Sequence, residues 1–560
     1  MREERPDGAD ILDEPHTEER PDLAERQTGP GHPPGHRRAR SPMPRGWAAL
    51  AWTVGAIALY ALLLRIALTE NVSSDPSNNV LQGWDMLHGN LLLHGWILGD
   101  VTFYTFELPL LGVIELFLGI HTIALHVALA LVYLLIIVCA TAIAVTGSRG
   151  AARVARAAIV VAVLAAPIFQ LTDSWIPISL PDHTGTSLFL LLPFLLIDRV
   201  GRADGDDRAS AARYTAPLLC LILAAGQLSD VTVRFVAVPA VVLVCGYQLL
   251  VARKLVNRDG MNVAAALLSV LLSLVVRKAM LHFHSYLMVA PQMKIAPVGL
   301  WLHHARVTWV DIREVFGAIA FTGHASAVND WAVVFGWICL VAVAIGMVRV
   351  LWRWRTARRA EQALLLAIVG NLAVFALSSL VNADSPHDII AIVPMGAVLA
   401  ARALIPERFT SRVAVLAGCA LAAVAALVPM SLSAARPLAR PTQAATLSTW
   451  LSAHHLHYGL AGYWDASSVT VQSGNQVQVR TVQTTEITTY AWESDSAWYD
   501  PAKHYANFVI FDPDESPTLA NVIRVFGKPV STHVVGRDKV LIYNKNLLPL
   551  VKAAKLPRTG

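Results

Sequence analysis

Residues 69–107 combine acidic, histidine and aromatic side chains and contain no lysine or arginine. Carboxylates can take protons or bind divalent ions, so such a stretch could form a catalytic or a metal site. The first candidate is Asp75, within Ser73-Ser74-Asp75-Pro76. Aspartate before proline is also typical of a helix start, so capping alone stays an open alternative. The other candidates in this stretch, for substrate binding, are His94, Trp96, Asp100, Tyr104 and Glu107.

A second polar stretch, residues 171–183, carries Asp173, Asp182 and His183. Aspartate and histidine are acceptable ligands for a divalent ion, although this spacing matches no dedicated metal motif. Asp182 could equally cap the helix that follows. A divalent metal ion is therefore left open as a cofactor, and its ligands would come from Asp75, Asp173, Asp182 and His183.

Cationic candidates for a site follow later in the chain. Arg234 is the one lysine or arginine of residues 229–234, Lys294 lies in a long polar stretch, and His387 is followed by Asp388. Acids in the first two stretches and cations in the later ones could face one another if all these stretches were loops on one side of a membrane.

The composition is that of a polytopic membrane protein. Of 560 residues, 55% are hydrophobic and 15% are charged, and the mean hydropathy is +0.50. Soluble domains have about 25% charged residues, and a membrane-spanning helix needs about 20 mostly apolar residues. Eleven segments are predicted as spans, some of them short: 47–68, 121–146, 156–171, 184–197, 214–229, 235–252, 262–281, 331–352, 362–381, 389–405 and 413–430.

The distribution of lysine and arginine orients these spans. One alternating set of loops contains 17 of these residues and the opposite set contains four. Because positively charged loops face the cytoplasm, the N-terminus is predicted to be cytoplasmic and residues 431–560 extracytoplasmic. Residues 108–119 are apolar but reach only about 18 Å as a helix, so we expect them to lie at the outer interface. A short re-entrant span is the alternative.

The two ends of the chain differ from the apolar part, residues 47–430. Residues 1–46 are rich in proline, acids and arginine and are predicted to be a disordered cytoplasmic tail. Residues 431–560 show helix signals at 446–455 and 518–526, and strand signals at 468–472, 476–482, 509–511 and 540–543. The predicted fold is an all-α membrane domain followed by an extracytoplasmic α/β domain. The five cysteines lie in apolar runs, so no disulfide framework is expected.

This layout resembles the GT-C superfamily of integral-membrane glycosyltransferases, which includes protein O-mannosyltransferases and the lipid A aminoarabinose transferase. Asp75 matches the acidic residue that follows the first span in that superfamily. Glu107-Leu108-Pro109-Leu110 stands where many relatives have His-Pro-Pro-Leu, and His387-Asp388 with Pro394 stands where they have an Arg-Tyr pair and a proline. The run from 458 to 464 is similar to the tails of bacterial members, and the Ala- and Arg-rich composition resembles actinobacterial membrane proteins.

The resemblance implies transfer of a sugar from a polyprenyl phosphate to an acceptor at the outer face of the membrane, with inversion. It implies that Asp75 is the general base and that Asp173 or Asp182 is a second acid or a metal ligand. Arg234, Lys294 and His387 are the implied contacts of the leaving phosphate. The expected partners are the lipid bilayer, the lipid-linked donor and an envelope glycan, lipid or protein acceptor, without nucleic acid.

Two other function classes stay open. A non-enzymatic scaffold for envelope assembly, or a degenerate GT-C fold, would explain the departures from the family motifs. A transporter is less well supported, because ionisable residues are few inside the predicted spans.

Overall fold

The computed structural model describes residues 45–166, 182–200, 205–253, 257–289, 293–319, 327–381, 386–407, 412–439, 441–514 and 519–554. The chain divides into two units, residues 1–53 and 54–560. In the first unit, the described residues are the beginning of helix α1 (Arg45–Ala67). The predicted disordered tail lies almost wholly outside the described residues, as does Asp173.

Every predicted span overlaps a helix. These helices are α1, α4 (Thr122–Val145), α5 (Ala151–Ala165), α6 (Thr186–Val200), α7 (Gly205–Ser229), α8 (Thr232–Ala252), α9 (Arg258–His282), α11 (Ala327–Trp352), α12 (Arg359–Leu377), α13 (Ile392–Leu404) and α14 (Arg412–Ala434). Within the described residues, seven helices are long and apolar enough to cross a membrane. The all-α membrane fold is confirmed, and the count of eleven spans stays a prediction.

Burial separates central helices from peripheral ones. Every residue of α13 from Ile392 to Ala403 is buried, in a core shared with α4, α5 and α6. In contrast, α9 exposes a row of apolar side chains that includes Leu267, Leu271 and Leu274. Such an exposed apolar row is stable in contact with lipid. A helix can lie in lipid because its backbone polar groups form hydrogen bonds within the helix.

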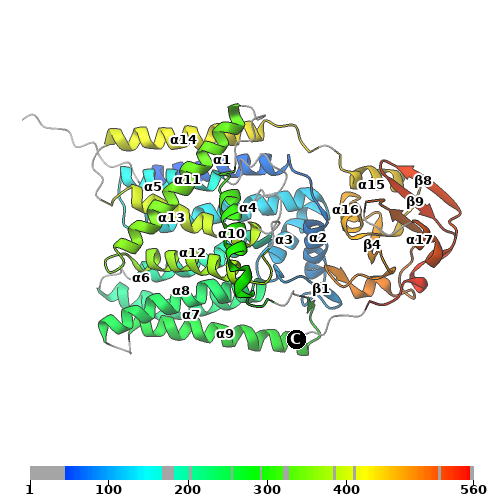
Figure 1. The fold of residues 1–560 in the computed structure, drawn as a ribbon, viewed down its shortest axis with the longest axis horizontal. Helices are drawn as coiled ribbons and strands as arrows, with labels where there is room; N and C mark the ends of the chain where they lie inside the picture. Colours follow the sequence, from blue (N-terminus) through cyan, green and yellow to red (C-terminus); the bar gives the residue numbers. More distant parts are fainter. Residues whose placement is uncertain are drawn as a thin grey trace, which may run out of the picture. The chain divides into compact units, whose positions relative to one another are not determined.

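A polar layer joins the end of α1 to α4. It contains α2 (Ser74–Leu87), β1 (Trp96–Leu98) and α3 (Glu107–Leu118). Helix α3 has the short length predicted for the interfacial helix, and Leu116 and Phe117 on it are exposed, the latter by 84%. Its place at the membrane surface stays a prediction. Figure 1 shows α2 between α3 and α16 (Tyr463–Gln472), and α2 packs against both.

Short elements bring other segments to this layer. They are η2 (Asp182–Thr184), β2 (Leu287–Met288), η3 (Val298–Leu300), α10 (Trp301–Val315) and η4 (Pro386–Ile389). The turns η2 and η4 lie in contact, and η4 also packs against α10 and α12.

The C-terminal residues form an α/β domain, as predicted. Its remaining elements are α15 (Gln443–Ala453), β3 (Tyr458–Ala461), β4 (Gln478–Gln483), β5 (Thr488–Thr489), β6 (Ser494–Asp495), η5 (Ser496–Tyr499), β7 (Phe508–Phe511), α17 (Leu519–Phe526), β8 (Ser531–Val535), β9 (Asp538–Ile542) and η6 (Leu548–Leu550). Six strands form a sheet in the order β5-β4-β3-β7-β9-β8, in which β4, β3 and β7 are parallel. The strand predicted at 468–472 is wrong, since these residues belong to α16.

A second, three-stranded sheet links the two parts of the chain. Strand β1 of the polar layer pairs with β2 in parallel and with β6 of the C-terminal domain in antiparallel, through Trp96 opposite Asp495 and Ile97 opposite Ser494. This pairing carries the C-terminal residues just before β6 to the polar layer.

Candidate functional site

Two adjoining pockets lie where the polar layer meets the helices and the C-terminal domain. The first, here called the acidic pocket, holds about 630 Å³ of empty space. It is lined by Asp75, Asn79, Gly99, Asp100, Val101, Phe103, Asp182, His387, Trp492 and Glu493. Four of these residues are acids, and they come from α2, from the segment after β1, from η2 and from the C-terminal domain. The fold therefore brings carboxylates distant in sequence to one space.

The second, here called the apolar pocket, holds about 610 Å³ and shares Asp100 and Val101 with the first. Its other lining residues are His183, Asp230, Val231, Thr232, Val236, Met293, Asn371, Val374, Phe375, Ser378, Leu380 and Asp388. Thr232 and Val236 of α8 and Asn371, Val374 and Phe375 of α12 form one side of it, and both helices are apolar enough to span the membrane. An apolar wall with a polar end suits an amphiphilic ligand.

Asp75 lies in the first turn of α2 and faces the C-terminal domain. The N-cap of α2 is Ser73, and no side-chain cap hydrogen bond is formed there. Instead, the Tyr463 hydroxyl donates a hydrogen bond to Asp75 Oδ1. Burial raises the pKa of Asp75, with Asp182 adding to the rise, while the Tyr463 hydrogen bond and His387 oppose it. The geometry thus gives this carboxylate contacts that helix capping does not require.

A chain of histidine and aspartate side chains connects the two pockets. His183 lies between two carboxylates, with Nδ1 2.7 Å from Asp230 Oδ2 and Nε2 3.0 Å from Asp388 Oδ1. His387 Nε2 lies 3.6 Å from Asp182 Oδ2 and 3.7 Å from Asp388 Oδ1. The two imidazoles stack with ring centroids 6.0 Å apart.

This chain keeps His183 protonated. Burial alone would lower the pKa of His183, but the carboxylates of Asp230 and Asp388 outweigh it and raise that pKa well above 6.5. Burial would likewise raise the pKa of Asp230, yet His183, Thr186 and the Thr232 amide bring it down to about 2. His183 is therefore an imidazolium at the polar end of the apolar pocket.

Burial raises the pKa of other acids in and around the acidic pocket. Burial raises the pKa of Asp100, and it raises the pKa of Glu493 to about 7. Glu493 accepts hydrogen bonds from the Gly99 amide, at 2.7 Å, and from the Gln82 side chain. Glu107, at the start of α3, has a pKa raised to about 8 by burial and packs against Gly185.

Three residues predicted to bind substrate hold the polar layer together and line neither pocket. Trp96 is buried and its Nε1 donates to Asp85 Oδ2 at 2.8 Å. The Tyr104 hydroxyl donates to the Leu91 carbonyl at 2.9 Å, and His94 Nδ1 lies 2.7 Å from the His284 carbonyl oxygen.

Two of the three residues predicted to contact phosphate, Arg234 and Lys294, lie outside both pockets, whereas His387 lines the acidic pocket. Arg234 donates to Gln227 Oε1 at 3.1 Å and to Ser273 Oγ at 3.4 Å, toward α7 and α9. Lys294 is exposed, and its backbone amide donates to Ser379. Among the described residues that line the two pockets, none is lysine or arginine.

Sequence reasoning did not select four residues that the structure places at the site: Asp230, Tyr463, Trp492 and Glu493. Asp230 was one acid in a short polar loop, and nothing distinguished it from a helix-capping residue. The last three belong to the C-terminal domain, and only β1–β6 pairing and the packing of α16 on α2 bring them there.

Two of the predicted metal ligands, His183 and Asp75, already have protein partners in the part of the chain that is described. Both ring nitrogens of His183 are engaged by carboxylates, and Asp75 Oδ1 accepts from Tyr463. An imidazole binds a metal through a free ring nitrogen. We therefore assign no metal-dependent step to these residues.

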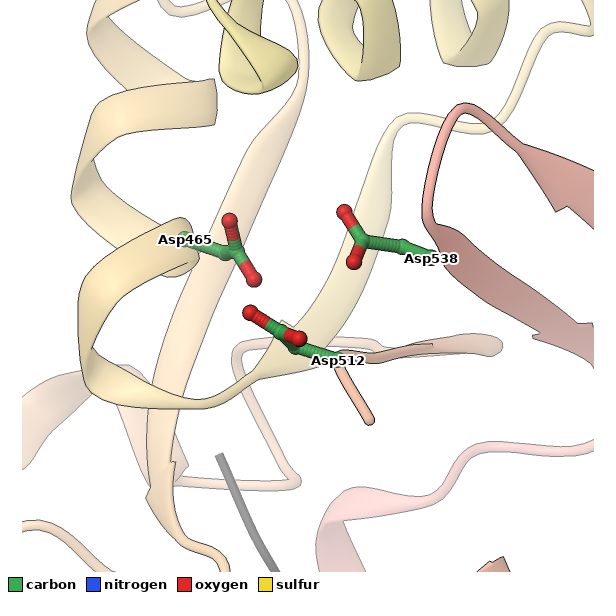
Figure 2. Close-up of side chains that lie close together, drawn as sticks. All are labelled: Asp465, Asp512 and Asp538. Atoms are coloured by element: carbon green, nitrogen blue, oxygen red, sulfur yellow. The ribbon is translucent and has the colours of Figure 1, made fainter. Parts of the chain in front are cut away.

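Another group of described carboxylates could hold a divalent ion. Asp465, Asp512 and Asp538 are buried in the C-terminal domain, with ligand oxygens within 4.8 Å of one another. Figure 2 shows the three carboxylates turned toward one another. Arg537 Nη2 lies 2.9 Å from Asp512 Oδ2, and Gln443 Nε2 donates to Asp538 Oδ2 at 2.7 Å, so neighbours already compensate part of this charge.

Comparison with known proteins identifies the fold. No protein-family model and no curated protein sequence matches the chain. ArnT from Cupriavidus metallidurans bound to undecaprenyl phosphate is 14% identical and has a TM-score of 0.55, with 89% of this chain and 98% of ArnT covered. Its apo structure gives 14% identity, a TM-score of 0.54, and coverage of 90% and 100%.

The Archaeoglobus fulgidus oligosaccharyltransferase in its apo form aligns less well, with 12% identity, a TM-score of 0.45, and coverage of 83% of this chain and 70% of its own. The fold is therefore assigned by its likeness to ArnT, an aminoarabinose transferase. The chain has the fold of ArnT, which is the GT-C fold that the sequence predicted.

Proposed function

We propose that this protein is a membrane glycosyltransferase that moves a sugar from a polyprenyl-phosphate donor to an acceptor at the outer face of the membrane. The main support for this proposal is the pair of adjoining pockets. One pocket is apolar and lies between predicted membrane-spanning helices, and the other is acidic. A lipid-linked sugar needs both environments, and its sugar must reach the acidic groups while its chain stays among apolar side chains.

The apolar pocket suits the donor lipid. Val236 of α8 and Val374 and Phe375 of α12 offer an apolar wall, and His183 lies at its polar end. ArnT, whose fold this chain shares, was solved with undecaprenyl phosphate. The His183 imidazolium would offset part of the negative charge of Asp230 and Asp388, which the donor phosphate would otherwise meet there.

The acidic pocket suits the acceptor. Asp75, Asp100, Asp182 and Glu493 line it, and His387 is the one basic side chain among its described lining residues. An anionic acceptor would be repelled by these carboxylates. We therefore expect the acceptor to be neutral or cationic, with a hydroxyl or an amine as the nucleophile.

The reaction follows from these placements. Asp75 takes the proton of the acceptor as the acceptor oxygen or nitrogen attacks the anomeric carbon of the sugar. The bond between that carbon and the phosphate oxygen breaks on the opposite face, so the configuration inverts. The polyprenyl phosphate leaves with the electron pair of the broken bond and with the negative charge.

Asp75→Asn tests the proposal. The amide is nearly isosteric but takes no proton at working pH, and loss of a general base costs about 10²–10⁴-fold in rate. Transfer from synthetic polyprenyl-phosphate sugars, followed by mass spectrometry, should therefore fall by that factor at an unchanged melting temperature. The matched control is Asp330→Asn, since Asp330 is an exposed aspartate in the first turn of α11. Equal turnover of Asp75→Asn and wild type would eliminate Asp75 as the base.

A second candidate is a non-enzymatic envelope-assembly protein with the same fold. The specific observation for it is that neither pocket has lysine or arginine among its described lining residues. It predicts that wild-type protein binds the lipid carrier and transfers no sugar from any donor to any acceptor.

A further inference from the structure

The C-terminal domain contacts α2 through buried polar groups that surround Asp75. Tyr463, the first residue of α16, donates to Asp75 Oδ1 and accepts a hydrogen bond from Asn78 Nδ2 at 3.3 Å. The Ser467 hydroxyl donates to Asn78 Oδ1, and the Ser74 and Ser468 hydroxyls lie 3.1 Å apart. Asn78, Ser74 and Ser467 are each no more than 1% exposed.

These contacts fix the direction of the Tyr463 hydroxyl. Burial and the nearby Asp75 and Glu493 carboxylates raise the pKa of Tyr463, so its hydroxyl stays protonated. Because Asn78 donates to the hydroxyl oxygen, the hydroxyl proton is directed to Asp75. The aromatic ring is held by stacking on Tyr490, with ring centroids 5.1 Å apart.

The same domain supplies two further walls of the acidic pocket. Trp492 and Glu493 precede β6, and Gly99 lets them approach the chain after β1. A Cβ atom at position 99 would lie 2.9 Å from Glu493 Oε1 and 3.0 Å from Trp492 Cζ2. Two residues of the C-terminal domain thus line the acidic pocket, and a third, Tyr463, contacts its lining residue Asp75.

We propose that the C-terminal domain completes the catalytic pocket and that Tyr463 is a positioning residue, which holds the Asp75 carboxylate so that Oδ2 faces the acceptor. This inference rests on the proposed function, in which Asp75 is the base. A carboxylate with one oxygen anchored loses rotational freedom before the acceptor arrives, and such preorganisation lowers the activation barrier. Tyr463 itself touches neither substrate.

Tyr463→Phe is the first test, because it removes the hydroxyl and keeps the ring stack. A hydrogen bond to a charged group is worth roughly 1.5–3 kcal/mol, so we expect kcat to fall by roughly 10- to 100-fold with little change in KM. The acid limb of the pH–rate profile should move to higher pH, because Tyr463 lowers the pKa of Asp75. The titratable groups that also face Asp75 are Asp182, His387 and Glu493, and all three are retained in this variant.

The matched control is Tyr458→Phe, since Tyr458 lies in β3 of the same domain and is 46% exposed. It should keep the wild-type kcat and pH profile. A second variant tests the inference even if Tyr463→Phe misfolds. The hydroxyl of 3-fluorotyrosine at position 463 is a stronger hydrogen-bond donor, so it should move the acid limb of the pH–rate profile to lower pH. A wild-type profile in both Tyr463 variants would overturn the inference, as would a loss of kcat that comes only with a lower melting temperature.

Infrared difference titration of wild type against Asp75→Asn separates failure of the inference from failure of the proposed function. It follows the ionisation of Asp75 without turnover. If wild type transfers no sugar, the proposed function fails. A rise in the pKa of Asp75 in Tyr463→Phe would then still support the role of Tyr463 in holding Asp75. If wild type transfers sugar and the titration is unchanged in Tyr463→Phe, the inference alone fails.

Discussion

Glu493 shows how burial and hydrogen bonding compete at a single carboxyl group. Burial raises its pKa from 4.5 to about 7, although the Gly99 amide and Gln82 donate to it and favour the charged form. The carboxyl is only 8% exposed, so the loss of hydration outweighs both hydrogen bonds. Near neutral pH the acidic pocket therefore contains one acid that changes its charge.

This pKa predicts a pH-dependent stability. Between about pH 4.5 and 7 the folded state binds more protons at Glu493 than the unfolded state does, so this group stabilises the fold at low pH and the contribution is lost as pH rises. The expected loss is on the order of 3 kcal/mol. Glu493→Gln should flatten the fall of the melting temperature between pH 5 and pH 8 in detergent.

The pKa of His183 is also raised, so its titration likewise lowers the stability of the fold as pH rises. The role of Glu493 is therefore tested by the difference between Glu493→Gln and wild type. Glu486→Gln is the control, since Glu486 is an exposed acid in the same domain. An identical pH dependence in Glu493→Gln and wild type would contradict the prediction.

At the scale of elements, α2 is the part that assembles the site. It carries Asp75 and Asn79 into the acidic pocket, packs on α3 on one side and receives α16 on the other. The contact with α3 depends on two glycines, Gly83 and Gly112. A Cβ atom at position 112 would lie 2.5 Å from the Gly83 carbonyl oxygen and 2.8 Å from Leu87 Cγ.

Gly112→Ala should therefore push α2 away from α3, because a backbone carbonyl cannot rotate aside as a side chain can. We expect a lower melting temperature, by several degrees, together with reduced sugar transfer, since Asp75 moves with α2. Overpacking of this kind costs about 1–3 kcal/mol. Gly246→Ala in α8, where no atom lies within 4 Å of the added Cβ, should leave both quantities unchanged or raise stability. Wild-type stability in Gly112→Ala would show that α2 and α3 do not require this close contact.

At the scale of the whole molecule, the orientation in the membrane depends on the charge bias of the loops. Two of the counted arginines, Arg156 and Arg402, are buried, and Arg402 lies 2.9 Å from Asp198 and 3.3 Å from Glu361. These two hold helices together and cannot contact lipid headgroups. The remaining arginines and lysines still favour the same side.

Reporter fusions test this orientation. Fusions after Arg149 and Arg359 should report the cytoplasm, and fusions after Asn78 and Ser473 should report the outside, because positive loops are retained in the cytoplasm. Alkaline phosphatase and a fluorescent protein serve as paired reporters at each position. A cytoplasmic signal at Ser473 would place the acidic pocket on the side opposite to the one proposed.

The sequence alone determined the membrane fold, because hydrophobic segments and charge bias act locally and need no knowledge of contacts. The sequence also identified the polar stretches that contain site residues. The structure places six residues of these stretches at the two pockets, namely Asp75, Asp100, Asp182, His183, His387 and Asp388. The sequence misjudged residues 468–472 because α16 is buried between the sheet and α2, and a helix buried on all sides has no amphipathic period. The tertiary structure alone decided that Tyr463 and Glu493 lie beside Asp75, which is about 400 residues earlier in the chain. That proximity depends on strand pairing and helix packing between distant segments, and no local pattern in the sequence encodes it.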